Sequence, residues 1–195
     1  MKEQELLSKF KKFPKPEKAA TYGTAGFRTQ GSQLPFVLFT VGILAVLRSK
    51  KLNGSMVGVM ITASHNPHTD NGVKLVEPNG DMLVAEWENY AIQLANCKSP
   101  EELLNAVSMI TTKEKIHHDK ALVGIGRDTR PSGVGLLEAV KDGISIAGGD
   151  LKDFGVVTTP QCHYMVASLN AGLDATCDSY YKKLSDAWRI IVVRF

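Results

Sequence analysis

One apolar run restricts the possible folds of this chain more than any other segment. Residues 56–61, Met-Val-Gly-Val-Met-Ile, follow an Asn-Gly pair and are typical of a buried strand. The run ends at residues 62–67, Thr-Ala-Ser-His-Asn-Pro, which are small, polar and closed by a proline, so the backbone must turn there. This turn displays the hydroxyl of Ser64 at the end of a strand. Because ligands bind at the carboxyl ends of strands in open α/β sheets, the segment predicts a binding site at Ser64.

Helix-length amphipathic segments alternate with strand-length apolar runs in the rest of the chain. Residues 36–47 carry apolar side chains at intervals of three and four, which predicts a helix that lays one face on a sheet. Residues 122–126 and 154–157 indicate parallel strands on either side of a helix that Ser132 caps and Gly148 ends. Further helices are predicted over residues 87–97, from 99 onward, over 158–169 and over 180–188. We therefore expect an α/β fold, a three-layer α/β/α domain with a mixed, largely parallel sheet.

A second turn is expected at Asn71-Gly72, just before Lys74 begins another apolar run over residues 73–76. Two turns so close together can bring this cation back beside Ser64. A turn serine bonded to its own backbone is the more common structure for a segment such as Ser-His-Asn-Pro. The neighbouring cation favours a different interpretation, in which Ser64 carries a phosphate.

Composition excludes several classes of function. The 195 residues have a net charge of +3, with lysines and arginines scattered apart from a cluster in the first 18 residues, so nucleic acid is not expected as a partner. The longest apolar run, residues 35–47, is shorter than the roughly 20 residues that a membrane-spanning helix needs. Charged residues precede any apolar segment, so no signal peptide is expected, and we expect a cytoplasmic protein. Cys97, Cys162 and Cys177 are widely spaced, which predicts reduced thiols with packing roles.

Three motifs carry a family resemblance. Residues 62–67 followed by 70–74, Asp-Asn-Gly-Val-Lys, resemble the phosphoserine loop of the α-D-phosphohexomutases. Residues 22–28, Tyr-Gly-Thr-Ala-Gly-Phe-Arg, resemble the N-terminal signature of their N-acetylglucosamine-phosphate branch, and residues 126–130, Gly-Arg-Asp-Thr-Arg, are a third match. The resemblance implies that residues 20–188 form the first domain of the phosphohexomutase fold, the phosphoserine domain. Residues 1–19 are then expected to form a loosely held N-terminal helix or arm, and residues 189–195 a divergent tail.

The resemblance also implies a reaction. It implies an isomerase that interconverts N-acetylglucosamine 6-phosphate and 1-phosphate through a phosphorylated Ser64, in UDP-N-acetylglucosamine synthesis. Ser64 would give its phosphoryl group to the phosphorylated amino sugar, the 1,6-bisphosphate would turn over in the site, and Ser64 would take back the other phosphate. Mg²⁺ would bind an oxygen of the Ser64 phosphate, while Lys74 and Arg28 would act on the proton or the charge. A mutase of the phosphoglucomutase or phosphomannomutase type is the alternative within the family.

The arginines of the motifs are candidate phosphate contacts. Arg28 is expected to bind phosphate, because a guanidinium matches two phosphate oxygens at once. Arg127 and Arg130 allow two interpretations: an ion pair with Asp128 that holds the loop, or a positive lining around the phosphorylated serine. Both interpretations stay open at the level of the sequence.

His65 and Asn66 are expected to support the loop and its phosphate. The pair Ser64-His65 suggests a serine hydrolase, but neighbouring side chains diverge and no acid partner is evident, so we disfavour that function. The spacing of His65, His68 and Asp70 suggests a metal site, but Pro67 breaks the helical spacing that metalloprotease histidines need. A role in ordering the loop remains the preferred interpretation for His65.

Several parts of the family pattern do not occur in this sequence. The family holds Mg²⁺ with an Asp-x-Asp-x-Asp cluster of its second domain, and its sugar-recognition and distal phosphate-binding loops belong to the third and fourth domains. The sequence therefore resembles the first domain of a four-domain enzyme, a truncated form whose partners would be the missing domains. It is then either the catalytic-serine domain of a mutase or a non-catalytic binding or regulatory product. By itself the chain is expected to be inactive.

Overall fold

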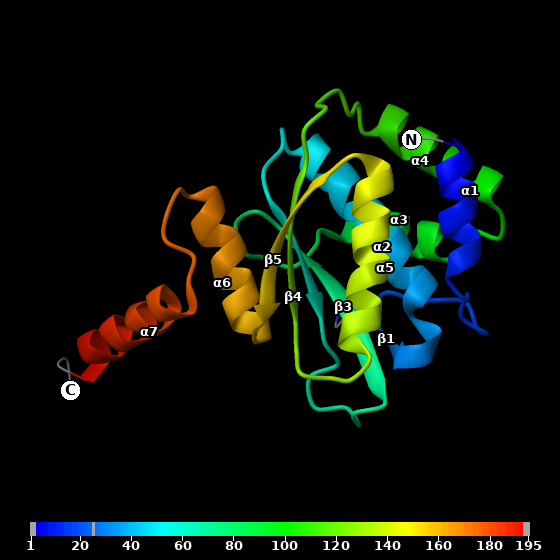
Figure 1. Cartoon of the computed structure of the whole chain (residues 1–195). Coiled ribbons are helices and arrows are strands. Elements are labelled where there is room, and N and C mark those ends of the chain that lie inside the picture. Colours follow the sequence, from blue (N-terminus) through cyan, green and yellow to red (C-terminus); the bar gives the residue numbers. More distant parts are fainter. Residues whose placement is uncertain (1–2, 25, 193–195) are drawn as a thin grey trace.

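The computed structural model describes residues 3–24 and 26–192, which fold into three layers (Figure 1). The central sheet contains β1 (Phe27–Gln30), β2 (Val57–Ile61), β3 (Asp70–Val76), β4 (Leu122–Arg127) and β5 (Asp150–Val156), in the order β1-β3-β2-β4-β5. β3 is antiparallel to β1 and to β2, whereas β2, β4 and β5 are mutually parallel. Only β3 is therefore reversed in this sheet, and the prediction of a mixed, largely parallel sheet in an α/β/α domain is confirmed.

Helices cover both faces of the sheet (Figure 1). On one face, α2 (Pro35–Lys51) packs against α5 (Gly133–Ala147) and against α3 (Ala85–Ala95), which α4 (Pro100–Lys113) follows. On the other face, α6 (Thr159–Asn170) packs against β2 and β4. A reciprocal capping box between Thr158 and Gln161 starts α6, and Gly148, with a φ of 73°, ends α5, as the sequence predicts.

Helix α2 is more deeply buried than its sequence pattern predicts. All residues from Phe36 to Ser49 are buried, because α2 lies between the sheet and two other helices and has no solvent face along this length. Two glycines permit the close crossing with α5. A Cβ on Gly42 would lie 2.4 Å from the carbonyl oxygen of Val140, and a Cβ on Gly143 would lie 2.0 Å from that of Phe39. The prediction of a helix that lays one face on the sheet is therefore confirmed, and the other faces of α2 are buried as well.

Helix α1 (Glu3–Lys12) is part of the core. Its residues Leu6 and Phe10 are buried, and Phe10 makes an edge-to-face contact with the ring of Phe36. Lys9 and Lys12 each donate a 2.6 Å hydrogen bond to a carboxylate oxygen of Asp142 on α5. The basic start of the chain therefore docks on the domain and is not the loosely held arm that its charge pattern predicts.

The second turn was expected at Asn71-Gly72, but these residues lie inside β3, which begins at Asp70. Asn71 is fully buried and its Nδ2 donates a 2.9 Å hydrogen bond to the Oγ of Ser132. Ser132 occupies the N-cap position of α5 as predicted, but its side chain makes no capping hydrogen bond. A Cβ on Gly72 would lie 2.6 Å from the carbonyl oxygen of Phe27, so glycine is needed here for close strand packing and not for a turn.

Helix α7 (Cys177–Val192) extends away from the sheet beyond α6 (Figure 1). None of its described residues is buried, and Trp188, Ile190 and Ile191 are more than half exposed. The divergent tail thus continues a helix as far as residue 192, and its last three residues lie outside the described part of the chain. No helix in the described ranges is long and apolar enough to cross a membrane.

Candidate active site

Ser64 lies in the loop that joins β2 to β3, and its side chain is exposed, as the sequence predicts. Its φ of 52° is in the left-handed region, which costs a non-glycine residue about 1–2 kcal/mol. Such a conformation persists only where surrounding contacts enforce it. The contacts of this loop therefore determine the conformation of Ser64.

Arg130 makes most of these contacts. Its Nε donates a 3.0 Å hydrogen bond to the Oδ2 of Asp128, and its side chain is only 8 % exposed. Its two terminal nitrogens donate to backbone carbonyls of the serine loop, namely those of Ser64, Asn66, Pro67 and Asp70, at 2.8, 2.9, 2.5 and 2.9 Å. Arg130 therefore forms the ion pair with Asp128 and at the same time holds the loop.

Thr62 holds the same loop from its other side. Its Oγ1 accepts a 2.9 Å hydrogen bond from the backbone N–H of Ser64 and donates a 2.7 Å hydrogen bond to the Oδ2 of Asp128. No sequence signature singles out Thr62. It stands within the motif, but its role depends on Asp128, which lies 66 residues further along the chain.

Arg28 on β1 and Lys74 on β3 face the same side of the sheet. Arg28 pairs with Gly72, and Lys74 pairs with Met60 of β2. Side chains alternate along strands, and Phe27 and Val73 belong to the core on the α2 face, so the two cations lie on the face that carries α6. The backbone N–H of Thr62 donates to the carbonyl of Gly72 at 3.0 Å, which brings the start of the serine loop next to this pair of strands.

The guanidinium of Arg28 is tied to the serine loop. Its Nη1 donates a 3.1 Å hydrogen bond to the Oδ1 of Asn66, whose Nδ2 donates in turn to the Oδ2 of Asp70 at 3.1 Å. Asn66 therefore links Arg28 to Asp70, and its role in supporting the loop and its phosphate stays a prediction. One buried donor of Arg28, its Nε, has no hydrogen-bond partner in the described part of the chain.

The N-terminal signature is fixed to the sheet by Tyr22. Its hydroxyl accepts a 3.2 Å hydrogen bond from the backbone N–H of Leu75, and its ring packs edge-to-face on Phe27. Burial raises the pKa of Tyr22 to about 12, so the hydroxyl remains neutral at physiological pH. This anchor positions the strand that carries Arg28.

The remaining candidates have fewer contacts. His65 is exposed, and its ring makes none of the hydrogen bonds found in the described ranges, so its role in ordering the loop stays a prediction. The Nε of Arg127 is buried without a hydrogen-bond partner there, and its side chain packs near Gly133 at the start of α5. The ion pair with Asp128 is therefore formed by Arg130, whereas no ion pair of Arg127 is found among the residues described.

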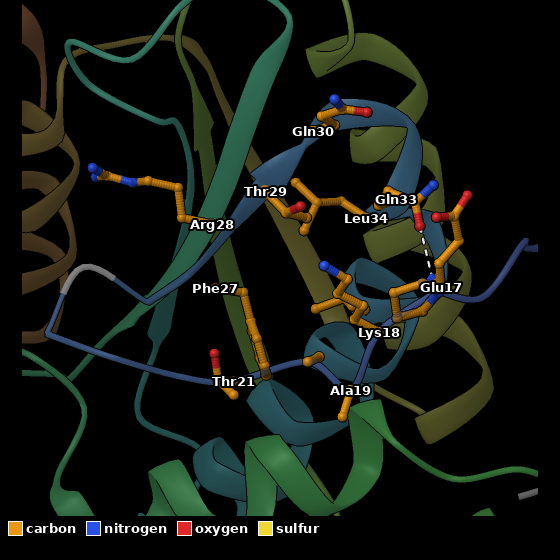
Figure 2. A pocket seen from close by; sticks show the side chains of 13 residues that line it. Glu17, Lys18, Ala19, Thr21, Phe27, Arg28, Thr29, Gln30, Gln33 and Leu34 are labelled. Carbon is orange, nitrogen blue, oxygen red and sulfur yellow. Dashed lines mark hydrogen bonds between the residues drawn. The ribbon is translucent and has the colours of Figure 1, made fainter.

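Two of the hollows near these residues are relevant to the site. One of about 490 Å³ adjoins Ser64 and is bordered by the chain that follows β4 and by the start of α6, including Thr129, Thr158 and Thr159. The other, of about 370 Å³, lies between residues 16–21 and β1 (Figure 2). Arg28 is among the residues that line this second cavity, and in Figure 2 its side chain points away from the other labelled side chains.

The described residues offer no complete metal site. Among the described residues, no group of three or more His, Cys, Asp or Glu side chains could hold a metal ion. Both carboxylate oxygens of Asp128, near Ser64, already accept hydrogen bonds from Thr62 and Arg130. A Ser64 phosphate would thus be a single ligand, and the residues present do not fit the complete binding site of a magnesium ion.

The fold and the site together define an α/β/α domain that presents a serine hydroxyl and cationic side chains at one end of its sheet. Residues 25–96 and 93–176 match the family model for phosphoglucomutase/phosphomannomutase, alpha/beta/alpha domain I. The chain belongs to this family. It is 52% identical over 171 residues to the phosphoacetylglucosamine mutase of Sus scrofa, an alignment that covers 86% of this chain and 31% of the pig protein.

Solved structures agree with this assignment. An N-acetylglucosamine-phosphate mutase of the α-D-phosphohexomutase superfamily, in a product complex, matches with a TM-score of 0.89 and 45% identity over 97% of this chain and 36% of its own. Two structures of the Aspergillus fumigatus N-acetylphosphoglucosamine mutase match over 96% of this chain and 36% of theirs. One is a serine-to-alanine variant with glucose 1,6-bisphosphate (TM-score 0.90, 40% identity), and the other contains GlcNAc-6P and magnesium (TM-score 0.86, 41% identity). The chain thus spans about a third of the length of these relatives.

Proposed function

We propose that this chain supplies the phosphorylated serine of a phosphoacetylglucosamine mutase. The observation that carries the proposal is the geometry of Ser64, an exposed hydroxyl in a tightly held loop at the end of β2, on the edge of the sheet that Arg28 and Lys74 approach. A phosphoserine bears roughly −1.5 to −2 charges, so cations next to it stabilise it. The names and ligands of the relatives support the same conclusion.

The reaction has two phosphoryl transfers. In the first, the bond between the Oγ of Ser64 and phosphorus breaks, and a bond forms between that phosphorus and a free hydroxyl oxygen of the sugar monophosphate. This sugar oxygen loses its proton, and the freed Oγ of Ser64 gains one. The sugar is then a bisphosphate. In the second, after the bisphosphate has turned over, the Oγ of Ser64 loses its proton and takes the other phosphoryl group, and the freed sugar oxygen gains a proton. Lys74 and Arg28 are proposed to stabilise the transferred charge, and Lys74 to exchange the proton.

The substrates are proposed to be a phosphorylated amino sugar and its 1,6-bisphosphate. This choice follows the relatives, which include complexes with GlcNAc-6P and with glucose 1,6-bisphosphate. The family model itself is described for phosphoglucomutase and phosphomannomutase, so a mutase that prefers unmodified hexose phosphates is the second candidate. The 52% identity to a phosphoacetylglucosamine mutase favours the amino sugar.

Mg²⁺ is the proposed cofactor, since one relative contains magnesium. When bound it would supply positive charge next to the phosphate. Because the described part of this chain lacks the further ligands, we propose that residues of another domain provide them, and the steps above do not depend on how they do so.

The test uses a fusion protein in which this chain replaces the matching third of the pig relative. The assay measures conversion of N-acetylglucosamine 6-phosphate to the 1-phosphate. The fusion is expected to be active and to carry one phosphoryl group on Ser64 by intact mass and peptide mapping. Ser64→Ala is expected to lose about 10⁴-fold or more of kcat. Ser145→Ala, an exposed serine on α5, is the matched control and should keep full activity. A folded but inactive wild-type fusion would support the non-catalytic alternative, and an active Ser64→Ala variant would rule out the phosphoserine.

A further inference from the structure

We propose that Thr62, Asp128 and Arg130 are positioning residues that fix the backbone of Ser64 in the conformation needed for phosphoryl transfer. The inference rests on the proposed function and extends it, because it concerns how the reacting hydroxyl is aimed and not which residue reacts. It assigns a role to Thr62, to which the sequence motifs alone assign none. It also assigns the charge of Arg130 to the loop and not to the phosphate.

The donors of Arg130 are all in use. A guanidinium has five N–H donors, and Arg130 has five acceptors: one oxygen of Asp128 and four carbonyls of the serine loop. To bind a phosphate directly, Arg130 would have to give up a carbonyl of the loop that carries that phosphate. The planar guanidinium bonds four carbonyls at once and therefore fixes the positions of these carbonyls relative to one another.

Both peptide groups of Ser64 are connected to the same carboxylate. The N–H of Ser64 bonds Thr62, which bonds the Oδ2 of Asp128, and the carbonyl of Ser64 accepts from Arg130, whose Nε bonds that same Oδ2. The Oδ1 of Asp128 accepts from the backbone N–H of Arg130 at 3.0 Å. Asp128 thus fixes the direction of both partners of Ser64.

Asp128 is itself held by the sheet. Its backbone N–H donates a 3.1 Å hydrogen bond to the carbonyl of Ile61, the last residue of β2, so the ends of β2 and β4 are bonded directly. The position of the carboxylate is therefore set by the register of two parallel strands. Since Ser64 has a positive φ, release of either peptide group would let the residue relax toward common backbone conformations and move its hydroxyl.

The first test uses the 195-residue chain and needs no activity. Amide hydrogen exchange is measured for peptides that cover residues 62–70 in four variants: Thr62→Val, Thr62→Ser, Arg130→Lys and Arg189→Gln. Thr62 is buried and valine matches its shape, so Thr62→Val removes the hydroxyl and little else. Exchange of the loop is expected to rise about tenfold or more in Thr62→Val and Arg130→Lys, because a freed amide exchanges through local opening. Thr62→Ser keeps the hydroxyl and should resemble the wild type.

Arg189→Gln removes a cation from the exposed face of α7 and is the control for loss of charge, with no expected change in the loop. Unfolding midpoints of all variants are measured alongside. If Thr62→Val does not fold, the comparison of Arg130→Lys with Arg189→Gln decides the question. Wild-type exchange across residues 62–70 in a folded Arg130→Lys or Thr62→Val variant would overturn the proposal.

The second test uses the active fusion described above. Thr62→Val is expected to lower kcat by about 10²-fold, since a misplacement of about 1 Å can cost that much, while KM stays close to the wild-type value. Thr62→Ser should restore kcat, which general loss of stability would not explain. Equal kcat values in Thr62→Val and the wild type would count against the positioning role, whereas failure of the proposed function would appear separately, as activity that survives Ser64→Ala.

Discussion

The Nη1 of Arg28 donates a 3.1 Å hydrogen bond to the Oδ1 of Asn66 and so ties the edge strand β1 to the loop that displays Ser64. The same guanidinium keeps a buried Nε without a partner in the described part of the chain. A buried donor without an acceptor is costly, and its presence beside an exposed serine is explained if an anion binds there. We therefore predict that Arg28 both holds Asn66 and contacts the phosphate.

Arg28→Met is expected to lower kcat/KM of the fusion enzyme by about 10²–10³-fold, because one electrostatic partner of the transferred phosphoryl group is lost. Arg28→Lys should recover only part of this loss, since an ammonium keeps the charge but not the fork that reaches both Asn66 and the phosphate. Steady-state kinetics and an unfolding midpoint for each variant provide the measurement. Full kcat/KM in Arg28→Met would show that Arg28 does not contact the phosphate.

The crossing of α2 and α5 leads to a prediction about stability. In Gly143→Ala the new Cβ would lie 2.0 Å from the carbonyl oxygen of Phe39, a backbone atom that can move only if the helices separate. We expect a loss of about 1–3 kcal/mol in the free energy of unfolding, as for other overpacked cores. Gly135→Ala on the same helix meets no atom within 4 Å and should instead gain up to about 1 kcal/mol of helix propensity. Urea unfolding of both variants is the measurement, and equal effects would contradict the role of the crossing.

The docking of α1 leads to a prediction about pH. Burial of Asp142 raises its pKa, but hydrogen bonds and charges from Lys12 and Lys9 outweigh burial and hold the pKa below the ordinary value of 3.8. A carboxylate with a lowered folded-state pKa stabilises the fold above 3.8, and this contribution falls as the pH drops below 3.8 through the folded-state pKa.

Asp142→Asn is therefore expected to lose about 1 kcal/mol of unfolding free energy at neutral pH, since both lysine pairs are partly solvated. The difference from the wild type should vanish at a pH below the folded-state pKa. Glu138→Gln, which removes a mostly exposed ion pair from the same helix, is the control and should change little. A loss in Asp142→Asn that does not depend on pH would contradict the ionic origin of the effect.

Local signals in the sequence predict four of the five strands, the βαβ unit and the exposed Ser64, because capping residues, turn residues and apolar runs act over a few positions. The short edge strand β1 (Phe27–Gln30) has no such signal. Features that depend on distant partners were missed. Asn71-Gly72 has the composition of a turn, but the amide of Asn71 is satisfied by Ser132 across the fold, and Gly72 is required by close strand packing. The basic residues of α1 indicate a solvated segment when the sequence is read locally. Their ion pairs with Asp142 have no local signal, because Asp142 lies about 130 residues away.

The residues of the site also divide into those that local motifs predict and those whose roles depend on distant contacts. Ser64, Arg28 and Lys74 could be named from their motifs, but the two interpretations of Arg127 and Arg130 could not be separated from sequence. Both are arginines next to Asp128, and only the fold shows that the serine loop lies within reach of Arg130. Thr62 was missed because a buried hydroxyl at the end of a strand has no sequence signature of its own.

Helix α7 leads to a prediction about the 195-residue chain by itself. Leu184, Trp188 and Ile191 follow one another at helical spacing and are each more than half exposed. An exposed apolar stripe of this kind favours association. We expect the chain alone to self-associate at high concentration in analytical ultracentrifugation, and Leu184→Gln combined with Trp188→Gln to shift it toward monomer. A wild-type chain that stays monomeric at all concentrations would contradict this expectation.

The same chain is expected to bind Mg²⁺ only weakly and to show no appreciable mutase activity. Its described residues offer no set of three metal ligands, and each missing electrostatic partner of the transferred phosphoryl group costs about 10²–10³-fold in rate. The described residues supply only some of these partners, so the costs are expected to multiply and to bring the rate below detection. In the assay, the purified chain, free of host mutase, is incubated with N-acetylglucosamine 6-phosphate, the 1,6-bisphosphate and Mg²⁺. The active fusion is the positive control. The monomeric double variant, Leu184→Gln with Trp188→Gln, is assayed in the same way. If it forms the 1-phosphate at a robust rate, this domain alone contains a complete site. The assignment of metal and sugar binding to other domains would then be wrong.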